Sequence, residues 1–168
     1  NDLSTLSRAE RGIADAPEII DVSDLLHTMH KQYEGEALKK QLHLNLEATG
    51  RLGKVNVSRL YLEELLQNFI TNGIKYTKEG SVTITAKRSK GQVTFAVSDT
   101  GIGISRGEQQ KVFNKFYRSE DYRIRETNGT GLGLHVSKTL ANKLQTKIVL
   151  KSRLNHGSTF SFELPVEP

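Results

Sequence analysis

The sequence predicts an α/β fold: a two-layer sandwich with a mixed, mostly antiparallel sheet and helices on one face. Two pairs of segments alternate apolar and polar residues around short turns, one pair around Gly91 and the other around residues 155–157, which is typical of β-hairpins. The segment 59–77 instead repeats its apolar residues with helical spacing. More than one hairpin together with such helices favours one sheet that is covered on one side.

Composition and charge exclude several classes of protein. The 168 residues suffice for one domain with a sizeable core, and 36% hydrophobic with 26% charged residues is ordinary for a globular protein. The absence of cysteine excludes a disulfide framework and a thiolate metal site. No apolar run reaches the roughly 18 residues of a membrane span, and the first residues do not resemble a signal peptide. The net charge of +5 is spread along the chain without a nucleic-acid-binding motif, so we expect no nucleic acid partner.

The chain is expected to divide into two parts. Residues 1–16 are expected to be the end of a longer helix with a linker, and 17–168 the main domain. A proline within 14–21 favours a linker there. A helix capped by Ser23 is expected to run to about Gln41, followed by a strand in the alternating segment 42–48.

The strongest helix signal follows Ser58, a plausible N-cap. The apolar residues expected to face the core from this helix are Leu62, Leu65, Leu66, Phe69 and Gly73. The remaining elements are expected in this order: strands at 81–88 and 92–99, a polar segment at 105–130 that contains one short helix, a helix at 133–143, and strands at 147–152 and 158–164. The expected totals are about five strands and three main helices.

A polar stripe borders the apolar face of the long helix. Asn68, Asn72 and Lys75 are spaced four and three residues apart, so they share one side of it. Asparagine is unfavourable inside helices, which suggests a purpose for the pair. An amide oxygen is a ligand suited to Mg²⁺, and an ammonium group can meet a phosphate. Hydrogen bonds to a neighbouring loop explain the two asparagines equally well.

Asp99 ends a predicted strand and opens a glycine-rich turn. Such a carboxylate can cap the turn, or it can accept the exocyclic amine of adenine and so reject guanine. The glycines concerned are Gly101 and Gly103 here, and Gly129, Gly131 and Gly133 further on; they suit tight turns or backbone N–H groups close to a phosphate. A P-loop motif is absent. A dinucleotide-binding fold is disfavoured too, because the acids at its expected spacing, Glu120 and Asp121, fall in a polar stretch rather than at the end of a second strand.

Four segments together carry a family resemblance. They are "LEELLQNFITNGIKYT", "SDTGIGI", "VFNKFYRSEDYRIRETNGTGLGL" and "GSTFSFELP", in this order. They resemble the N, G1, F, G2 and terminal boxes of the catalytic ATP-binding domain of bacterial sensor histidine kinases, in the superfamily shared with gyrase, MutL and a heat-shock chaperone. The resemblance covers about residues 21–165, and the first twelve residues resemble the last turns of the preceding dimerisation helix. It implies the Bergerat ATP-binding fold.

The resemblance implies ATP or ADP with Mg²⁺ as cofactors. Asn72 resembles the main Mg²⁺ ligand, and Asn68 the first asparagine of the N box. Lys75 and Arg118 are expected near the phosphates and, with the two asparagines, form the expected catalytic set. Tyr76 is expected to pack on adenine, Asp99 to receive its amine, and Thr159 to support that end. The other residues expected around the nucleotide are Gly101, Gly103, Ile104, Phe113, Tyr117, Gly129, Thr130, Gly131, Leu132, Gly133 and Leu134, although plain core packing explains Phe113 equally well.

The same resemblance implies a protein-histidine kinase. It would transfer the γ-phosphate of ATP to a histidine on a separate dimerisation domain of the same kinase and reach a response regulator indirectly. This domain is expected to be cytoplasmic without direct membrane contact, and its parent protein to be a membrane-anchored homodimer. The family's phosphoacceptor box is missing: none of His27, His30, His43, His135 and His156 has its context. The alternatives are a regulatory nucleotide-binding module, or an ATPase of the superfamily; an acid often stands at position 68 in such ATPases, so the asparagine favours phosphotransfer.

Overall fold

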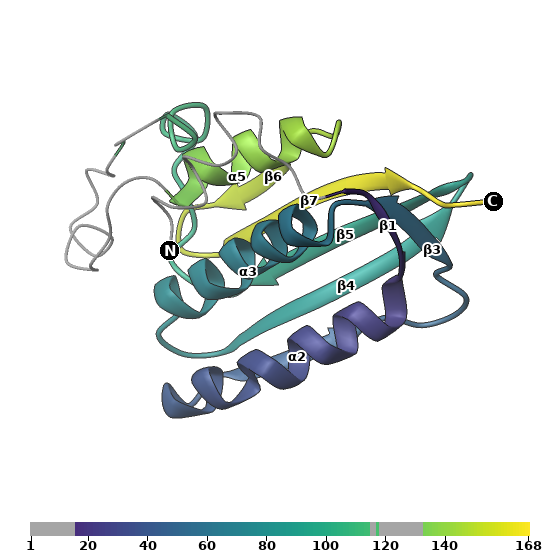
Figure 1. Ribbon diagram of the computed structural model, residues 1–168. Coiled ribbons are helices and arrows are strands. Elements are labelled where there is room, and N and C mark those ends of the chain that lie inside the picture. Colours follow the sequence, from purple (N-terminus) through teal and green to yellow (C-terminus); the bar gives the residue numbers. More distant parts are fainter. Residues whose placement is uncertain (1–15, 115–116, 118–132) are drawn as a thin grey trace.

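Five strands form the main sheet, in the order β2–β4–β5–β7–β6 (Figure 1). The computed structural model describes residues 16–114, 117 and 133–168, so the helix expected within the first dozen residues lies outside the described part. Strand β2 pairs with β4 in parallel, and every other neighbouring pair is antiparallel. The predicted mixed, mostly antiparallel sheet is therefore confirmed. The strands are β2 (His43–Glu47), β4 (Ser81–Ser89), β5 (Gln92–Asp99), β6 (Val149–Arg153) and β7 (Gly157–Pro165).

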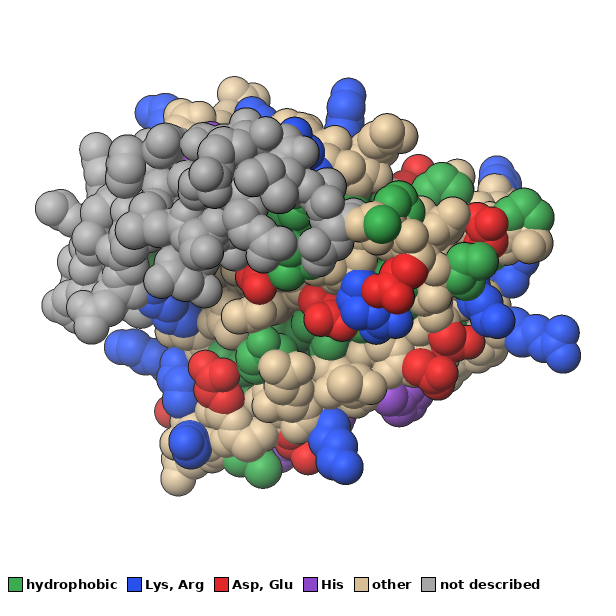
Figure 2. Space-filling view, in the orientation of Figure 1, with side chains coloured by type: hydrophobic (Ala, Val, Ile, Leu, Met, Phe, Trp, Pro, Cys, Tyr) green, Lys and Arg blue, Asp and Glu red, His purple; other side chains and the backbone are tan. Residues whose placement is uncertain are grey.

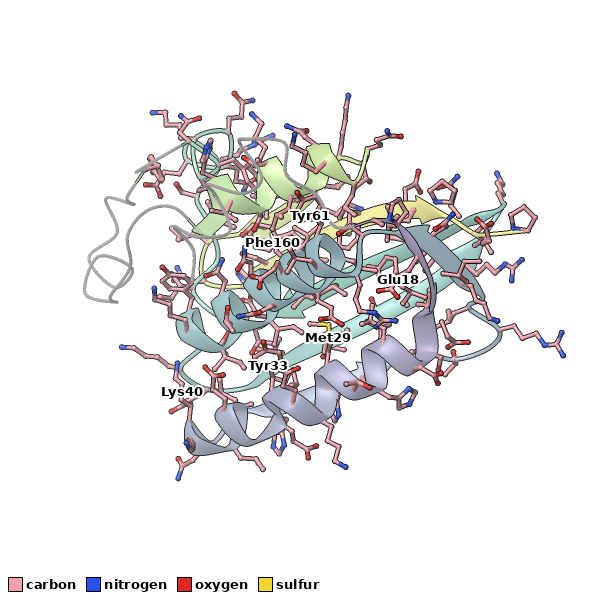
Figure 3. All side chains as sticks on the ribbon, viewed as in Figure 1. Glu18, Met29, Tyr33, Lys40, Tyr61 and Phe160 are labelled. Carbon is pink, nitrogen blue, oxygen red and sulfur yellow. The ribbon has the colours of Figure 1, made fainter. Side chains whose placement is uncertain are left out.

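Three helices cover one face of this sheet, as predicted (Figure 1). They are α2 (Val22–Lys39), α3 (Arg59–Tyr76) and α5 (Gly133–Lys143). Met29 and Tyr33 of α2 point between α2 and α3 (Figure 3), and both are buried. The predicted apolar face of α3 is confirmed, since Leu62, Leu65, Leu66, Phe69 and Gly73 are all buried.

Stacked aromatic rings join α3 to the sheet. Phe69 stacks on Phe160 with ring centroids 5.1 Å apart, and Phe95 stacks on Phe162 at 5.0 Å. Phe69 also lies 6.2 Å from Phe162, so the rings form one continuous cluster. Aromatic pairs of this kind add to the free energy that burial alone supplies. This cluster fixes α3 over β5 and β7, the strands that carry the site.

Helix caps explain where the two long helices begin. The Ser58 side chain accepts a hydrogen bond from the Tyr61 N–H at 3.3 Å, so the predicted cap of α3 is confirmed. The predicted cap of α2 is wrong: Asp21, not Ser23, caps it, accepting from the Asp24 N–H at 3.0 Å. Val22 is fully buried and must already belong to the helix, which moves the cap one residue ahead of it.

Two further expectations need correction. The linker predicted over 14–21 contains β1 (Glu18–Asp21), which pairs antiparallel with β3 (Lys54–Val57) as a separate two-stranded sheet. Each strand is four residues long, too short for alternation to distinguish it from a loop. The short helix expected after residue 105 is a series of turns up to residue 114, because most of its backbone hydrogen bonds reach back only three residues.

Candidate functional site

The carboxyl end of α3 lies against the end of β5. A Cβ added to Gly73 would lie 3.0 Å from Val82 and 3.7 Å from the Cβ of Asp99, so glycine allows this close approach. The Ile102 N–H then donates to the Tyr76 carbonyl at 3.2 Å. This hydrogen bond attaches the glycine turn after β5 to the last turn of α3. The polar stripe of α3 and the Asp99 carboxylate, which are far apart in the sequence, therefore border one site.

The stripe on α3 divides into two functional parts. Asn68 is only 7% exposed, and its Nδ2 donates to the Ser137 hydroxyl of α5 at 3.4 Å. Its amide thus joins α3 to α5. The alternative to a metal site was a hydrogen bond to a neighbouring loop, whereas the partner found is a helix. Asn72 is half-buried, and its amide hydrogen-bonds to none of the described residues. An amide at this position can bind a ligand.

Lys75 and Tyr76 are the last two residues of α3, and their side chains contact each other. The Lys75 ammonium lies 5.4 Å from the centre of the Tyr76 ring, within the range of a cation–π contact. Both side chains are half-buried. The contact holds a positive charge and an aromatic face together at the edge of the site.

Asp99 carries the carboxylate of the site. Its Oδ1 accepts from the Gly101 N–H at 2.9 Å, and the backbone N–H of Ser158 on β7 also hydrogen-bonds to the carboxylate. Burial raises the pKa of the Asp99 carboxyl above its ordinary value, and the two backbone donors oppose this shift. A ligand that donates a further hydrogen bond here would stabilise the charged form.

The turn from Gly101 to Ile104 is held by the β6–β7 hairpin. Gly103 has φ +73°, and a Cβ there would lie 2.1 Å from the Arg153 carbonyl oxygen, so only glycine fits. The Ile104 N–H donates to the Ser152 hydroxyl at 2.7 Å. Because the same hydroxyl also pairs with that of Ser158 at 2.7 Å, Ser152 links the turn to the strand beside Asp99.

Thr159 lies beside Asp99 on the neighbouring strand. It is the register partner of Ser98, and the two hydroxyls are 2.8 Å apart. Asp99 itself pairs with Ser158, and because side chains alternate between the two faces of a strand, the Ser98–Thr159 pair lies one position along from the carboxylate and on the other face of the sheet. The role predicted for Thr159 stays a prediction. Ser98 and Ser152 were missed, because a serine in an alternating strand carries no functional signal.

The site is poor in metal-binding carboxylates. Within the described ranges, no group of three His, Asp or Glu side chains comes together, so a cation here would depend on amide oxygens and on phosphates.

The surface is mixed in charge: Figure 2 shows acidic and basic side chains interspersed on the visible face. None of the helices in the described part is both long and apolar enough to cross a bilayer.

Residues 58–168 match the family described as histidine kinase-, DNA gyrase B-, and HSP90-like ATPase. The chain belongs to this family. Its relatives include the sensor histidine kinase RppB of Synechocystis, 34% identical over 98% of this chain, and the sensor-like histidine kinase SenX3 of Mycolicibacterium smegmatis, 33% identical over 99%. This ATPase domain is therefore of the type that sensor histidine kinases contain as their catalytic domain. It spans 37% and 43% of those two relatives.

Solved structures agree with this assignment. Full-length ShkA in complex with AMPPNP superposes with a TM-score of 0.83 and 26% identity, over 98% of this chain and 34% of ShkA. The nucleotide-free catalytic domain of histidine kinase ThkA has a TM-score of 0.77 over 90% of this chain and 96% of its own. At 24% identity, ThkA supports the fold alone.

The remaining predicted residues of the ATPase domain fall into two groups. Phe113 packs edge-on against Phe160 with ring centroids 6.2 Å apart, while the Tyr117 hydroxyl donates to the Glu108 carboxylate. Ile104 and Leu134 are partly buried against the core, and α5 begins at Gly133. Arg118, Gly129, Thr130, Gly131 and Leu132 lie outside the described residues.

The five histidines of the ATPase domain lie on different elements. His27 is exposed and lies 2.8 Å from the Ser23 carbonyl, and His30 lies 2.6 Å from the Leu44 carbonyl. His43 and His156 are exposed on an edge strand and in a turn, and His135 is half-buried in α5. Of the five, His27, His43 and His156 are exposed, and His30 lies between α2 and β2, away from the Asp99 turn.

Proposed function

We propose that this ATPase domain binds Mg·ATP and transfers the γ-phosphoryl group to a histidine on a separate dimerisation domain of the same kinase. One observation carries the proposal: the Ile102–Tyr76 hydrogen bond brings the α3 stripe and the Asp99 turn to one site. A base recognised at Asp99 then has its phosphates directed along α3. The AMPPNP complex of ShkA, which shares this fold, supports an adenine nucleotide as the ligand.

Each end of the nucleotide has its own residues in this proposal. Asp99 accepts the adenine amine, with Gly101, Gly103 and Ile104 lining the turn and Thr159 supporting that end. Tyr76 packs on the base. Asn72 holds Mg²⁺, with Asn68 beside it. The residues proposed around the phosphates are Lys75, Phe113, Tyr117, Arg118, Gly129, Thr130, Gly131, Leu132, Gly133 and Leu134.

Rate acceleration by this site would come from positioning and charge. Asn72 offers one amide oxygen to Mg²⁺, an ion that keeps several waters and takes phosphate oxygens as its other ligands. When bound, the ion neutralises phosphate charge. Lys75 adds a point charge on the same stripe, and the protein itself forms no covalent bond to phosphate.

The acceptor lies outside this chain in our proposal. None of the five histidines lies in a phosphoacceptor box. Position 68 is an asparagine, which hydrogen-bonds to Ser137, and not an acid that could activate water for hydrolysis. The parent protein would then be a membrane-anchored homodimer that reaches a response regulator through its phosphorylated histidine, with this domain on the cytoplasmic side.

Labelled ATP tests the proposal. The chain is incubated with radiolabelled Mg·ATP, alone and with the dimerisation domain of the same kinase. We expect acid-labile label on the dimerisation domain and none on the chain alone. Binding without transfer would favour a regulatory nucleotide module, and release of inorganic phosphate without label would favour an ATPase. Label on the chain alone that disappears in His135→Ala would place the acceptor in α5.

A further inference from the structure

Thr77 directly follows α3 and is fully buried. Its hydroxyl is the single buried side-chain polar atom in the described part of the chain that has no hydrogen-bond partner. A buried hydroxyl without a partner lowers stability, because it has lost its hydrogen bonds to water. Such groups are rare in folded proteins, and one of their explanations is a role in function.

The position of Thr77 connects it with Asp99. A Cβ built on Gly101 would lie 2.8 Å from the Thr77 hydroxyl oxygen and 3.0 Å from Oδ1 of Asp99. The two oxygens therefore border the same small space over the Cα of Gly101. Gly101 has no side chain to fill that space beside the hydroxyl and the carboxylate.

The carboxylate can use a further donor. It already accepts from the backbone N–H groups of Gly101 and Ser158, and a carboxylate has about four acceptor positions. A base that donates its amine to this carboxylate would remove the remaining contact of the carboxylate with water. The charged form then depends more strongly on donors from the protein.

We propose that Thr77 is a positioning residue for nucleotide recognition: its hydroxyl donates to the Asp99 carboxylate when a 6-amino purine binds there. This inference rests on the proposed function, since it assumes that Asp99 receives the base. The hydroxyl has no partner in the nucleotide-free protein and gains one in the complex. It therefore lowers the stability of the free protein and raises the affinity for the ligand.

Thr77→Val tests this assignment, because valine has the shape of threonine without the hydroxyl. Calorimetry with ADP and thermal unfolding without nucleotide are compared with wild type. We expect ADP to bind about tenfold more weakly, the equivalent of one hydrogen bond, while the unfolding temperature of the free protein stays equal or rises. Loss of a residue with only a structural role would not weaken ADP binding while the unfolding temperature stays equal or rises.

Three comparisons keep the result decisive. Thr77→Ser retains the hydroxyl and should bind ADP within about twofold of wild type. Thr71→Val removes a half-buried hydroxyl that bonds to the Gln67 carbonyl at 2.8 Å within α3, and should leave ADP affinity unchanged. GDP carries an oxygen at C6 in place of the amine, so it should bind Thr77→Val and wild type equally.

Failure of this inference differs from failure of the proposed function. If wild type binds ADP and Thr77→Val binds it equally well, the inference is wrong and the proposed function stands. If wild type does not bind ADP, the proposed function is wrong. Should Thr77→Val not fold, Thr77→Ser and Thr77→Ala are compared, and equal ADP affinities of these two overturn the inference.

Discussion

The side-chain ammonium of Lys40 lies 2.5 Å from the carbonyl oxygen of Ile74 and 3.2 Å from that of Lys75 (Figure 3). Lys40 follows the last residue of α2, whereas the two carbonyls belong to the last turn of α3. Carbonyl groups at the end of a helix have no partner within it and carry partial negative charge. Lys40 therefore joins the ends of the two helices at the turn that carries Lys75, a residue that we assign to the phosphates.

We expect Lys40→Met to lower the free energy of unfolding by about 1 kcal/mol, since it removes a charged donor at a helix end. Lys39→Met is the matched control, because Lys39 is an exposed neighbour with the same charge. It should change the unfolding free energy by no more than a few tenths of a kcal/mol. Urea unfolding of both variants measures this, and equal losses would show that Lys40 acts only through net charge.

Adenine selectivity follows from the buried carboxylate of Asp99. ATP and ADP should bind at least about tenfold more tightly than GTP, because the oxygen that guanine presents would face the carboxylate without a hydrogen bond. Asp99→Asn keeps the size of the side chain but turns a donor towards the adenine amine. It should weaken ATP binding by about 1–3 kcal/mol in calorimetric titration. Equal affinities for ATP and GTP in the wild type would contradict the assignment.

The same residue predicts a dependence of stability on pH. Burial raises the pKa of Asp99 in the folded protein, so between the unfolded and folded pKa values the folded state binds more protons. Its contribution to stability is therefore fully present below about pH 4 and decreases as the pH rises through the folded pKa. Asp99→Asn lacks this titration, so the unfolding free energy of wild type relative to the variant should fall over this range. A difference that rises with pH would contradict the assignment of burial as the dominant cause.

Asn72 is the residue on which we expect Mg²⁺ binding to depend. Asn72→Ala should remove the enhancement of ATP affinity by Mg²⁺, so that the dissociation constants measured with and without the ion become about equal. The fold should persist, since the side chain is half-buried and its amide bonds to none of the described residues. Asn142→Ala, at an exposed position of α5, is the control and should keep the full enhancement.

Local signals in the sequence predicted more of this protein than distant ones. The Ser58 cap and the apolar face of α3 depend on residues a few positions apart, and both are confirmed. Strand β1 was missed because four residues carry little periodicity and its partner, β3, lies beyond the whole of α2. The contact of Lys40 with Ile74 spans 34 residues and likewise leaves no pattern.

In the site, too, features set by adjacent residues were predicted, and features set by distant residues were not. Asp99 and the glycine turn could be located from sequence, since a carboxylate and a tight turn are properties of adjacent residues. The role of Ser152, which accepts from Ile104 across 48 residues, depends on how the β6–β7 hairpin meets that turn. The unpartnered hydroxyl of Thr77 depends on burial and could only be found in the structure.

Two glycines distinguish a conformational cost from a steric requirement. Gly35 lies inside α2, and a Cβ added there has no atom within 4 Å, so Gly35→Ala should raise the free energy of unfolding by about 0.5–1 kcal/mol through the entropy of the unfolded chain. A Cβ at Gly101 would instead lie 2.3 Å from the Tyr76 carbonyl oxygen, part of the backbone. Gly101→Ala must therefore move the turn away from α3 and break the Ile102–Tyr76 hydrogen bond, which should lower both stability and ATP affinity. Urea unfolding and calorimetry on both variants check this, and an unchanged ATP affinity in Gly101→Ala would show that the join between the turn and α3 is not needed for binding.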